Sequence, residues 1–329
     1  MRHGLLVVLG FLAALALAPA FGGGEPGGGA GAPSFADIVA RADPSVVRVT
    51  TLLEGGRMPS SRDDAVGAGF VFASDGWIVT NRHVLQGARA VHVDLLGVGI
   101  LRARVVGVDE ATDVAVLHVE AKGLPTLRWG NPARLRKGDW VLSAGSPFRL
   151  ARSWSVGIVS GLGRFGLGVN PKGYEDYIQT DAAANRGSSG GPLLDARGTV
   201  VGMTTAILSR SGTYQGVSLA VPIDIVIETA ERLRAQGRID RPDLGLLLRE
   251  GQAVPGTGET GLVVTGLVPG STGGAAGLRR GDVIVQVDDR PTPRRADLQR
   301  VLWGLAPGSQ VTVIFVRGRR RLQVRALTR

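Results

Sequence analysis

Short runs of alternating apolar and polar positions follow one another along most of the chain. The β-branched run from Val46 to Leu53 is typical of a strand, and Asp75-Gly76 between two apolar runs is typical of a hairpin turn. Further short strands are predicted at residues 67–72, 90–95, 102–109, 114–119, 140–143, 153–160 and 198–204. Short strands at even spacing are typical of β-barrels.

Two segments depart from this β pattern. Pro222 to Gln236 has the spacing of an amphipathic helix, with a proline early and Gly237 directly after its end. Residues 238–242 are then the expected linker to a second domain, in which Asp297 to Leu302 is expected to be helical. Gly161 to Tyr177 is long and rich in glycine, so we expect a loop that moves.

The N-terminus has the pattern of an export signal. A basic start is followed by an apolar run from Leu5 to Ala18 and by Ala18-Pro19-Ala20, which resembles a cleavage site. We expect a signal peptide at residues 1–20 and a flexible linker at residues 21–34. An uncleaved anchor is the alternative, although a spanning helix needs about 20 apolar residues. Both interpretations place the body outside the cytoplasm, most simply in a bacterial periplasm.

Composition limits the chemistry that is available. The chain has 329 residues, of which 44% are hydrophobic and 5% aromatic, enough for two domains with a core each. It has no cysteine, which excludes disulfides and thiol catalysis. None of the four histidines has a partner at metal-site spacing, so we expect neither a metal nor another cofactor.

The formal net charge of +10 includes a local cluster of arginines at Arg317, Arg319, Arg320, Arg321 and Arg325. One interpretation is a solvated hairpin turn between the last two strands. The other is weak attraction to anionic lipid headgroups or other polyanions. We expect no nucleic-acid partner.

The stretch from Gln179 to Leu194 carries the candidate chemistry. Ser189 follows Gly187 by two places and precedes two further glycines, so the backbone N–H groups of Gly187 and Ser189 can converge on one point. Acyl transfer needs such donors for the oxyanion that forms after attack. Ser188 lacks this arrangement, which makes Ser189 the predicted nucleophile. A flexible turn is the alternative interpretation of the same residues.

Partners for a serine nucleophile occur upstream. A hydroxyl needs a base within hydrogen-bond reach, and the base needs a carboxylate that fixes its tautomer. His83 stands at the end of an apolar run, and Asp113 stands just before another. The order histidine, aspartate, serine is that of chymotrypsin-type enzymes.

Several motifs together resemble the HtrA/Deg serine proteases. They are Thr80-Asn81-Arg82-His83-Val84, Thr112-Asp113-Val114-Ala115-Val116-Leu117, Gly145-Ser146-Pro147-Phe148, Gly157-Ile158-Val159-Ser160 and the stretch from Gln179 to Leu194. The resemblance implies a mainly β fold, with a chymotrypsin-like double β-barrel protease domain at residues 35–237 and a C-terminal PDZ domain (α+β) at residues 243–329. It also implies a homotrimer.

The resemblance assigns roles to individual residues. It places the base on His83, the acid on Asp113, the nucleophile on Ser189 and the oxyanion donors on Gly187 and Ser189. Arg164 resembles an arginine involved in a switch of the loop beside the oxyanion hole. Phe35 is the implied trimer contact, and ordinary packing beneath the first strand is its alternative. Arg186 and Ser188 stand where the family usually has proline and asparagine.

The walls of the substrate pocket follow from the same resemblance. The place that is acidic in trypsin-like enzymes, six residues before the serine, is Ala183, and Asp181 is two residues off. With Ile207 and Leu219 nearby, we expect an apolar pocket for Val, Leu, Ile or Ala. Burial contributes about 0.8 kcal/mol per methylene, so discrimination among aliphatic residues should be weak.

The second domain resembles a PDZ domain through the run from Ala276 to Val287, which includes Gly-Leu-x-x-Gly-Asp-Val-Ile. A PDZ groove adds an extended peptide to a sheet edge, and backbone N–H groups hold the terminal carboxylate. By position, the peptide-binding loop is Leu244, Gly245 and Leu246. A plain strand start is the alternative. Asp243 stands where an aromatic residue is common, which we expect to weaken carboxylate binding.

These features favour an exported, ATP-independent serine endopeptidase that degrades misfolded or regulatory proteins, with roles in protein quality control and stress response. Its expected partners are unfolded or peptide substrates and C-terminal peptides at the PDZ groove. One alternative is a chaperone or PDZ adaptor with a latent protease domain. Another is an anchored regulatory protease with one signalling substrate.

Overall fold

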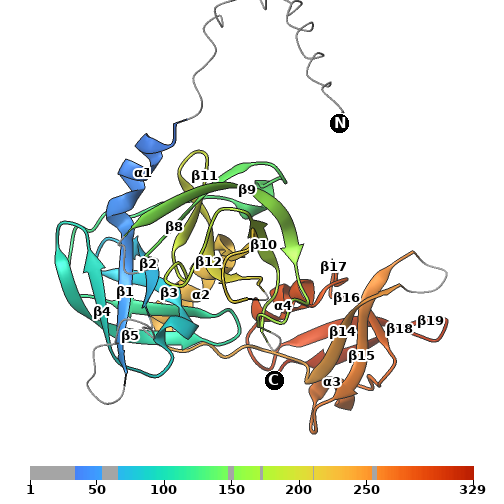
Figure 1. Cartoon of the computed structure of the whole chain (residues 1–329). Helices are drawn as coiled ribbons and strands as arrows, with labels where there is room; N and C mark the ends of the chain where they lie inside the picture. Colours follow the sequence, from blue (N-terminus) through green and yellow to red (C-terminus); the bar gives the residue numbers. More distant parts are fainter. Residues whose placement is uncertain (1–33, 54–65, 147–151, 171–172, 210, 254–257) are drawn as a thin grey trace, which may run out of the picture. The chain divides into compact units, whose positions relative to one another are not determined.

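The computed structural model describes residues 34–53, 66–146, 152–170, 173–209, 211–253 and 258–329 (Figure 1). The expected signal peptide and residues 21–33 of the linker lie outside the described residues, as does Pro147-Phe148. The chain divides into two units, Met1–Phe35 and Ala36–Arg329. Within the described residues, no helix is both long and apolar enough to cross a membrane.

The first six long strands of the second unit close into a barrel. The helix α1 (Ala36–Ala42) and a 3-10 turn η1 (Asp43–Ser45) lead into it. Around the barrel the strands run in the order β1-β2-β3-β6-β5-β4. Their bounds are β1 Val46–Leu53, β2 Val66–Ala73, β3 Trp77–Asn81, β4 Ala88–Leu95, β5 Gly99–Asp109 and β6 Val114–His118.

Alternation of side chains fills this barrel. Residues of β4 alternate between buried and more exposed positions, as the period of two in a strand requires. Val47, Val49, Ile78 and Leu117 are fully buried in one cluster. β-branched and aliphatic residues suit such a half-buried pleated surface. The barrel is therefore a firm support for the connections after β3 and between β5 and β6.

A second barrel follows, and again six strands close it. The order is β11-β8-β9-β10-β13-β12, the pairing of β11 with β12 completes the circle, and β7 (Arg128–Trp129) joins β12 in parallel. The bounds are β8 Trp140–Gly145, β9 Ser153–Arg164, β10 Tyr177–Thr180, β11 Pro192–Asp195, β12 Thr199–Ile207 and β13 Ser218–Pro222. A further 3-10 turn, η3, spans Pro132–Arg134.

Two expectations about this region have different outcomes. The predicted helix is confirmed as α2 (Ile223–Gln236), which ends where Gly237 takes a left-handed φ of 73° and donates to the Leu233 carbonyl. The expected loop at residues 161–177 begins later than predicted. β9 continues through Arg164 because β10 pairs with it, Gln179 facing Gly161 and Tyr177 facing Arg164. Cross-strand pairing outweighs the weak strand preference of glycine.

The third sheet belongs to the C-terminal domain. Its strands run in the order β14-β15-β16-β18-β19, and β17 pairs with β16. Two helices accompany the sheet, and Asp297 to Leu302, predicted to be helical, lies inside α4. The bounds are β14 Leu246–Ala253, β15 Thr260–Leu267, α3 Thr272–Ala275, β16 Val283–Val287, β17 Arg290–Pro291, α4 Arg295–Trp303, β18 Gln310–Arg317 and β19 Arg320–Leu327.

The arginine cluster lies on the hairpin of β18 and β19, as one of its two interpretations predicts. Arg317 donates to both carboxylate oxygens of the buried Asp282, at 2.7 and 2.9 Å. Arg321 pairs with Glu259 at 2.7 Å. Partners within the domain thus already neutralise part of the cluster. Attraction to anionic lipid stays a prediction.

Arg241 of the expected linker is anchored to a residue of the first barrel and to a residue of α2. Its guanidinium donates to the Asp109 carboxylate at 2.8 Å and to the Thr229 hydroxyl at 2.9 Å. It also lies over the Trp303 ring, 4.0 Å from its centroid. Asp109 is 5% exposed, so loss of Arg241 would leave a buried carboxylate without its countercharge.

Candidate active site

The predicted base lies directly after a strand of the first barrel. β3 ends at Asn81, and the 3-10 turn η2 (Arg82–Leu85) turns the chain so that His83 stands at the barrel rim. Val84 and Leu85 in the same turn are buried and fix it to the core. The His83 side chain is 41% exposed, so its ring is accessible to a substrate.

The predicted acid faces this ring. The Nδ1 atom of His83 lies 2.6 Å from Asp113 Oδ2, and the His83 backbone N–H donates to Asp113 Oδ1 at 3.0 Å. Two contacts to one carboxylate fix both the ring and its peptide. With Nδ1 bonded to the carboxylate, the tautomer with a free Nε2 lone pair is favoured, which is what a general base needs.

The backbone of Asp113 is held in an unusual conformation. Its φ is 57°, a left-handed value that is rare for residues other than glycine. The Arg82 N–H and the Asn81 side-chain amide both donate to its carbonyl, at 2.9 and 3.0 Å. In the preceding turn, Thr112 donates to the Asp109 carboxylate at 2.6 Å through its hydroxyl. These bonds stabilise the strained position and aim the acid at the base.

The predicted nucleophile lies on a turn between β10 and β11 of the second barrel. The Ala68 N–H of the first barrel donates to the Ser189 carbonyl at 2.8 Å, and the Gly190 N–H donates to Thr204 at 2.8 Å. Gly190 has a φ of 90°, and a Cβ there would collide with the Ala68 carbonyl and the Thr80 hydroxyl. Only glycine therefore lets the turn approach the first barrel this closely.

Thr205 connects the nucleophile with the acid. The Ser189 hydroxyl donates to the Thr205 carbonyl at 3.3 Å, and the Thr205 hydroxyl donates to Asp113 Oδ2 at 2.9 Å. Asp113 in turn bonds the His83 ring. The three predicted triad residues thus belong to one hydrogen-bonded network, in which the serine hydroxyl bonds Thr205 instead of the ring. Catalytic hydrogen bonds of this kind are often loose without substrate and tighten in the complex.

Ser188, the other candidate nucleophile, is turned inward. Its side chain accepts a hydrogen bond from the Asn185 N–H at 3.2 Å, and the residue is 4% exposed. Gly145 packs against it so closely that a Cβ would lie 2.7 Å from Ser188 Cα. These contacts favour Ser189 as the nucleophile.

The predicted oxyanion donors are the backbone N–H groups of Gly187 and Ser189. Gly187 has a φ of 99°, and the Ser146 N–H holds its carbonyl at 2.9 Å. No described residue accepts a hydrogen bond from the N–H of Gly187 or of Ser189. Two donors in a turn beside a hydroxyl can stabilise a developing oxyanion.

Comparison with known proteins gives the family. Residues 67–203 match the trypsin-like peptidase domain, and residues 242–328 match the PDZ domain. The HtrA-type protease AlgW, solved with a tripeptide, is 33% identical with a TM-score of 0.80, over 90% of this chain and 97% of that chain. This chain belongs to the HtrA-type serine proteases. A serine endoprotease from Yersinia pestis is also similar, with 27% identity and a TM-score of 0.69, over 90% of this chain and 98% of that one.

Sequence relatives agree on the HtrA-type family. A probable periplasmic serine endoprotease, DegP-like, of Pseudomonas putida (strain F1) is 33% identical over 88% of this chain and 68% of its own length. A relative with the same name from Ectopseudomonas mendocina is 36% identical over 89% of this chain. The present chain spans 61% of the length of that relative.

The predicted pocket residues of this HtrA-type chain lie on segments around the nucleophile. Ala183 is exposed, and its carbonyl accepts a hydrogen bond from the Ser155 hydroxyl at 2.8 Å. Ile207 ends β12, two residues after Thr205, and is partly exposed. Leu219 on β13 is buried, 1% exposed, and pairs with Gln179. The Tyr214 hydroxyl donates to the Asp181 carbonyl nearby.

Arg164, the predicted switch residue, does not contact the triad. It ends β9 and donates to the Gln179 side chain at 2.7 Å, ten residues before the nucleophile. The loop after it approaches the PDZ domain, where Asp176 pairs with Arg294 of that domain at 2.8 Å. Tyr177 follows this loop as the first residue of β10. Burial raises the pKa of its hydroxyl, and the nearby carboxylates of Glu175 and Asp113 raise it further.

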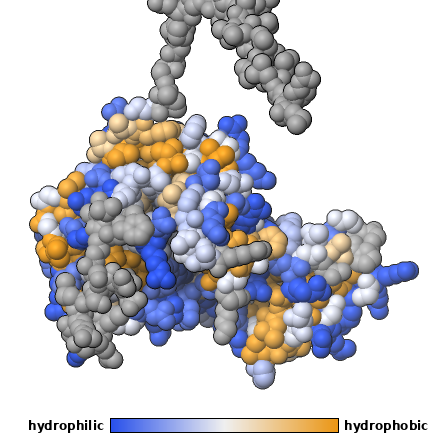
Figure 2. Space-filling model, viewed as in Figure 1, coloured by the Kyte–Doolittle hydropathy of each residue, from blue (hydrophilic) through white to orange (hydrophobic). Residues whose placement is uncertain are grey.

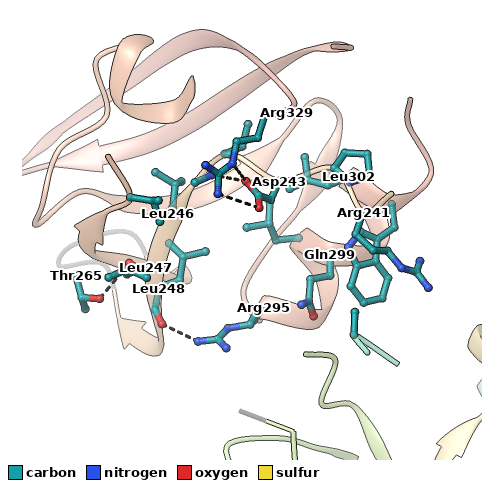
Figure 3. A pocket seen from close by; sticks show the side chains of 17 residues that line it. Arg241, Asp243, Leu246, Leu247, Leu248, Thr265, Arg295, Gln299, Leu302 and Arg329 are labelled. Carbon is teal, nitrogen blue, oxygen red and sulfur yellow. Dashed lines mark hydrogen bonds and ion pairs between the residues drawn. The ribbon is translucent and has the colours of Figure 1, made fainter. Parts of the chain in front are cut away.

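The PDZ domain has a groove of about 490 Å³ between β14 and α4 (Figure 3). Leu244, Gly245 and Leu246, the predicted peptide loop, are among its lining residues, as are Leu298 and Leu302 of α4. Leu244 is buried, and Gly245 has a φ of 65°. The groove therefore has the apolar wall and the glycine turn that extended-peptide binding requires.

Sequence reasoning missed three contacts in these two sites. Thr205 was not among the predicted site residues, yet its hydroxyl bonds the acid. The Asn81 side-chain amide donates to the Asp113 carbonyl, although only His83 of the same motif was predicted to take part in catalysis. At the groove, Arg295 donates across it to the Leu248 carbonyl at 2.9 Å. None has a local signal, because each contact joins residues far apart along the chain.

Proposed function

We propose that the protein is an exported, ATP-independent serine endopeptidase. The observation that carries the proposal is the network from the His83 ring through Asp113 and Thr205 to the Ser189 hydroxyl. A base oriented by a carboxylate beside an accessible hydroxyl is the arrangement for nucleophilic acyl transfer. Membership in the HtrA-type family supports the same reaction.

In the proposed mechanism Ser189 Oγ attacks the scissile carbonyl while His83 Nε2 takes its proton. The N–H groups of Gly187 and Ser189 stabilise the oxyanion, and loss of one such donor costs on the order of a hundredfold in rate. The His83 imidazolium then protonates the leaving amine. Water hydrolyses the acyl-enzyme by the same proton path in reverse. Asp113 stays ionised and stabilises the imidazolium.

Ala183, Ile207 and Leu219 are the proposed walls of the substrate pocket. Ala183 brings no negative charge to the place where trypsin-like enzymes hold one. Small and medium aliphatic residues are therefore the proposed preference at the cleaved bond. Mapping of cleavage sites in an unfolded protein checks this, and frequent cleavage after Lys or Arg would contradict it.

The proposed setting is the periplasm, where the enzyme would remove misfolded or regulatory proteins under stress. Relatives named as periplasmic endoproteases support this address, and the predicted signal peptide agrees with it. The PDZ groove would bind an extended peptide along β14. Fractionation of cells that express the full chain tests the address and separates a released enzyme from an anchored one.

A homotrimer is the proposed assembly. Apolar residues gather on the visible face where α1 lies, which supports self-association there (Figure 2). Phe35, just before α1, is the proposed contact. Sedimentation of the wild type and of Phe35→Ala tests it, and an unchanged monomer in both would contradict it.

Arg164 is the proposed switch residue of the loop beside the oxyanion turn. Its bond to Gln179 links β9 to the strand that leads to the nucleophile, and Asp176 links the same loop to the PDZ domain. Hydrogen exchange of residues 165–176 with and without bound peptide tests the switch. Identical protection in both states would contradict it.

Labelling with a fluorophosphonate is the decisive test of the peptidase proposal. The wild type should be labelled and should cleave casein without ATP, whereas Ser189→Ala should do neither. Ser188→Ala is the matched control, because Ser188 is turned inward, and it should still be labelled. Intact casein and an unlabelled wild type would favour a chaperone or PDZ adaptor with a latent protease domain.

A further inference from the structure

The peptide loop of the PDZ domain already holds a carboxylate of this chain. Asp243 lies two residues before Gly245, and its Oδ1 accepts the Gly245 N–H at 2.7 Å. The Arg329 guanidinium donates to the same oxygen at 2.6 Å (Figure 3). An Asp side chain that bonds the backbone N–H two residues on is a common local turn. Here the turn occupies a donor that the terminal carboxylate of a peptide would need.

Asp243 is fixed in this position by more than its side chain. Its backbone carbonyl accepts the Arg329 N–H at 3.0 Å. The loop after it is fixed as well, since Val268 donates to the Gly245 carbonyl and Gly273 to the Leu244 carbonyl, both at 2.9 Å. The loop therefore cannot turn its N–H groups elsewhere without breaking bonds to the rest of the domain.

A second carboxylate at this loop would meet the first. A terminal carboxylate that bonds the Gly245 N–H would lie against Asp243 and would compete with it for Arg329. Two carboxylates that share the same hydrogen-bond donors lie close together, and their negative charges repel each other. A backbone amide brings no charge and meets no such repulsion.

The end of the groove is also open to solvent. The side chains of Asp243 and Arg329 are 54% and 40% exposed. A peptide that lies along β14 can thus continue past the loop, which an interior segment of a longer chain must do.

We propose that Asp243 is a specificity-determining residue, and that it makes the groove select interior apolar segments of unfolded polypeptides over free C-termini. This inference rests on the proposed role of the groove as a peptide site. It departs from the C-terminal ligands that the family resemblance implies. Arg329 balances the charge of Asp243, so this pair presents no net charge to the ligand. The Gly245 N–H already has an acceptor.

Fluorescence anisotropy with paired peptides tests the inference on the full chain carrying Ser189→Ala, which prevents cleavage. Both fluorescein-labelled decapeptides have the same apolar sequence, and one ends in a carboxylate and the other in a carboxamide. We expect the carboxamide to bind at least as tightly as the carboxylate. With Asp243→Ala added, the carboxylate should gain about tenfold, because the Gly245 N–H and Arg329 become available to it.

Two further variants keep the result interpretable. Asp289→Ala removes an exposed carboxylate on the same domain and should leave both affinities unchanged. Asp243→Asn keeps an acceptor for Gly245 but removes the charge, so it should give part of the gain even if Asp243→Ala loosens the loop.

The outcomes are distinct. A tenfold preference of the Asp243-containing protein for the carboxylate would overturn the inference. Failure of both peptides to bind any of these proteins would overturn it together with the proposed peptide site. The peptidase assignment depends on labelling of Ser189, so neither result changes it.

Discussion

Among the described residues, the turn beside the nucleophile and the peptide loop of the PDZ domain differ in whether their backbone donors already have an acceptor. Beside the nucleophile, no described residue accepts from the N–H groups of Gly187 and Ser189. In the PDZ domain, the Gly245 N–H already bonds the Asp243 carboxylate. Both turns use a glycine with positive φ, 99° in Gly187 and 65° in Gly245. A glycine with positive φ is thus common to both turns, while the state of the nearby N–H groups differs.

The contrast between free and occupied N–H donors in the described residues indicates what each glycine turn is suited to bind. A site for a transient oxyanion has to stabilise charge that develops only during the reaction, so its donors must be available beforehand. A groove that binds neutral peptide segments benefits from a filled carboxylate position, because unsatisfied donors are costly to bury. In the PDZ turn it is the Asp243 carboxylate, two positions before the glycine, that already occupies the donor.

Of the four changes described below, loss of the Asp113 charge should lower the catalytic rate most. Asp113→Asn should lower kcat by about 10⁴-fold, since an amide favours the wrong imidazole tautomer. Peptide hydrolysis measured against pH checks this. The affinity of the PDZ groove for peptides should stay unchanged, and a parallel loss of binding would show that the two sites are not separable.

Crowding the nucleophile turn should have the next largest effect. Gly190→Ala drives a methyl group into the Ala68 carbonyl and the Thr80 hydroxyl, so Ser189 must shift. We expect kcat to fall by about a hundredfold or more, because displacements near 1 Å cost that much. Gly97→Ala is the control. It has a φ of 76° with no atom within 4 Å of the new Cβ, and equal losses in both variants would contradict the explanation.

Thr205 is a positioning residue, and its substitution should lower kcat less than the Asp113 and Gly190 variants do. Thr205→Val removes a hydroxyl bond to a charged carboxylate, a contribution of about 1.5–3 kcal/mol. That corresponds to a ten- to hundredfold lower kcat. The pH–rate profile should shift with it, and Thr205→Ser should restore both. An unchanged profile would indicate a merely structural role.

Gly245→Ala should give the smallest effect, confined to the PDZ domain. The new Cβ would lie 2.5 Å from Ser271 Cβ, in a left-handed conformation that costs about 1–2 kcal/mol. We expect peptide affinity to fall about tenfold while fluorophosphonate labelling of Ser189 persists. Anisotropy and labelling on the same preparation check this, and loss of labelling would refute the separation of the sites.

Much of the fold could be predicted because side-chain alternation is local. The strand from Val46 to Leu53 and the helix up to Gln236 were predicted with their observed ends. The candidate triad could be proposed from local motifs in a fixed order, because His83 follows an apolar run, Asp113 precedes one and Ser189 lies in a glycine-rich stretch. The extension of β9 to Arg164 could not be predicted, because glycines weaken the local pattern and only pairing with β10 settles it.

Contacts between distant residues set the limit of prediction. Thr205 and Asp113 are 92 positions apart, and Arg241 and Asp109 are 132 apart. Nothing in the neighbouring sequence marks Arg241 as the countercharge of a buried carboxylate. The sequence shows that Asp243 stands where an aromatic residue is common. Its partner Arg329 lies 86 positions away and could not be inferred from the neighbouring residues. Only the folded chain brings these pairs together.

His83 and Asp113 are joined by a side-chain bond and by a backbone-to-side-chain bond, and this pairing bears on how the proposed switch would act. Both residues come from the first barrel, and backbone as well as side-chain bonds join them, so they form a preassembled dyad. In the proposed switch, the second-barrel turn is then the part that shifts, while this dyad stays in place. A low-field imidazole proton resonance should persist in latent and active protein alike, and in protein whose serine is chemically blocked.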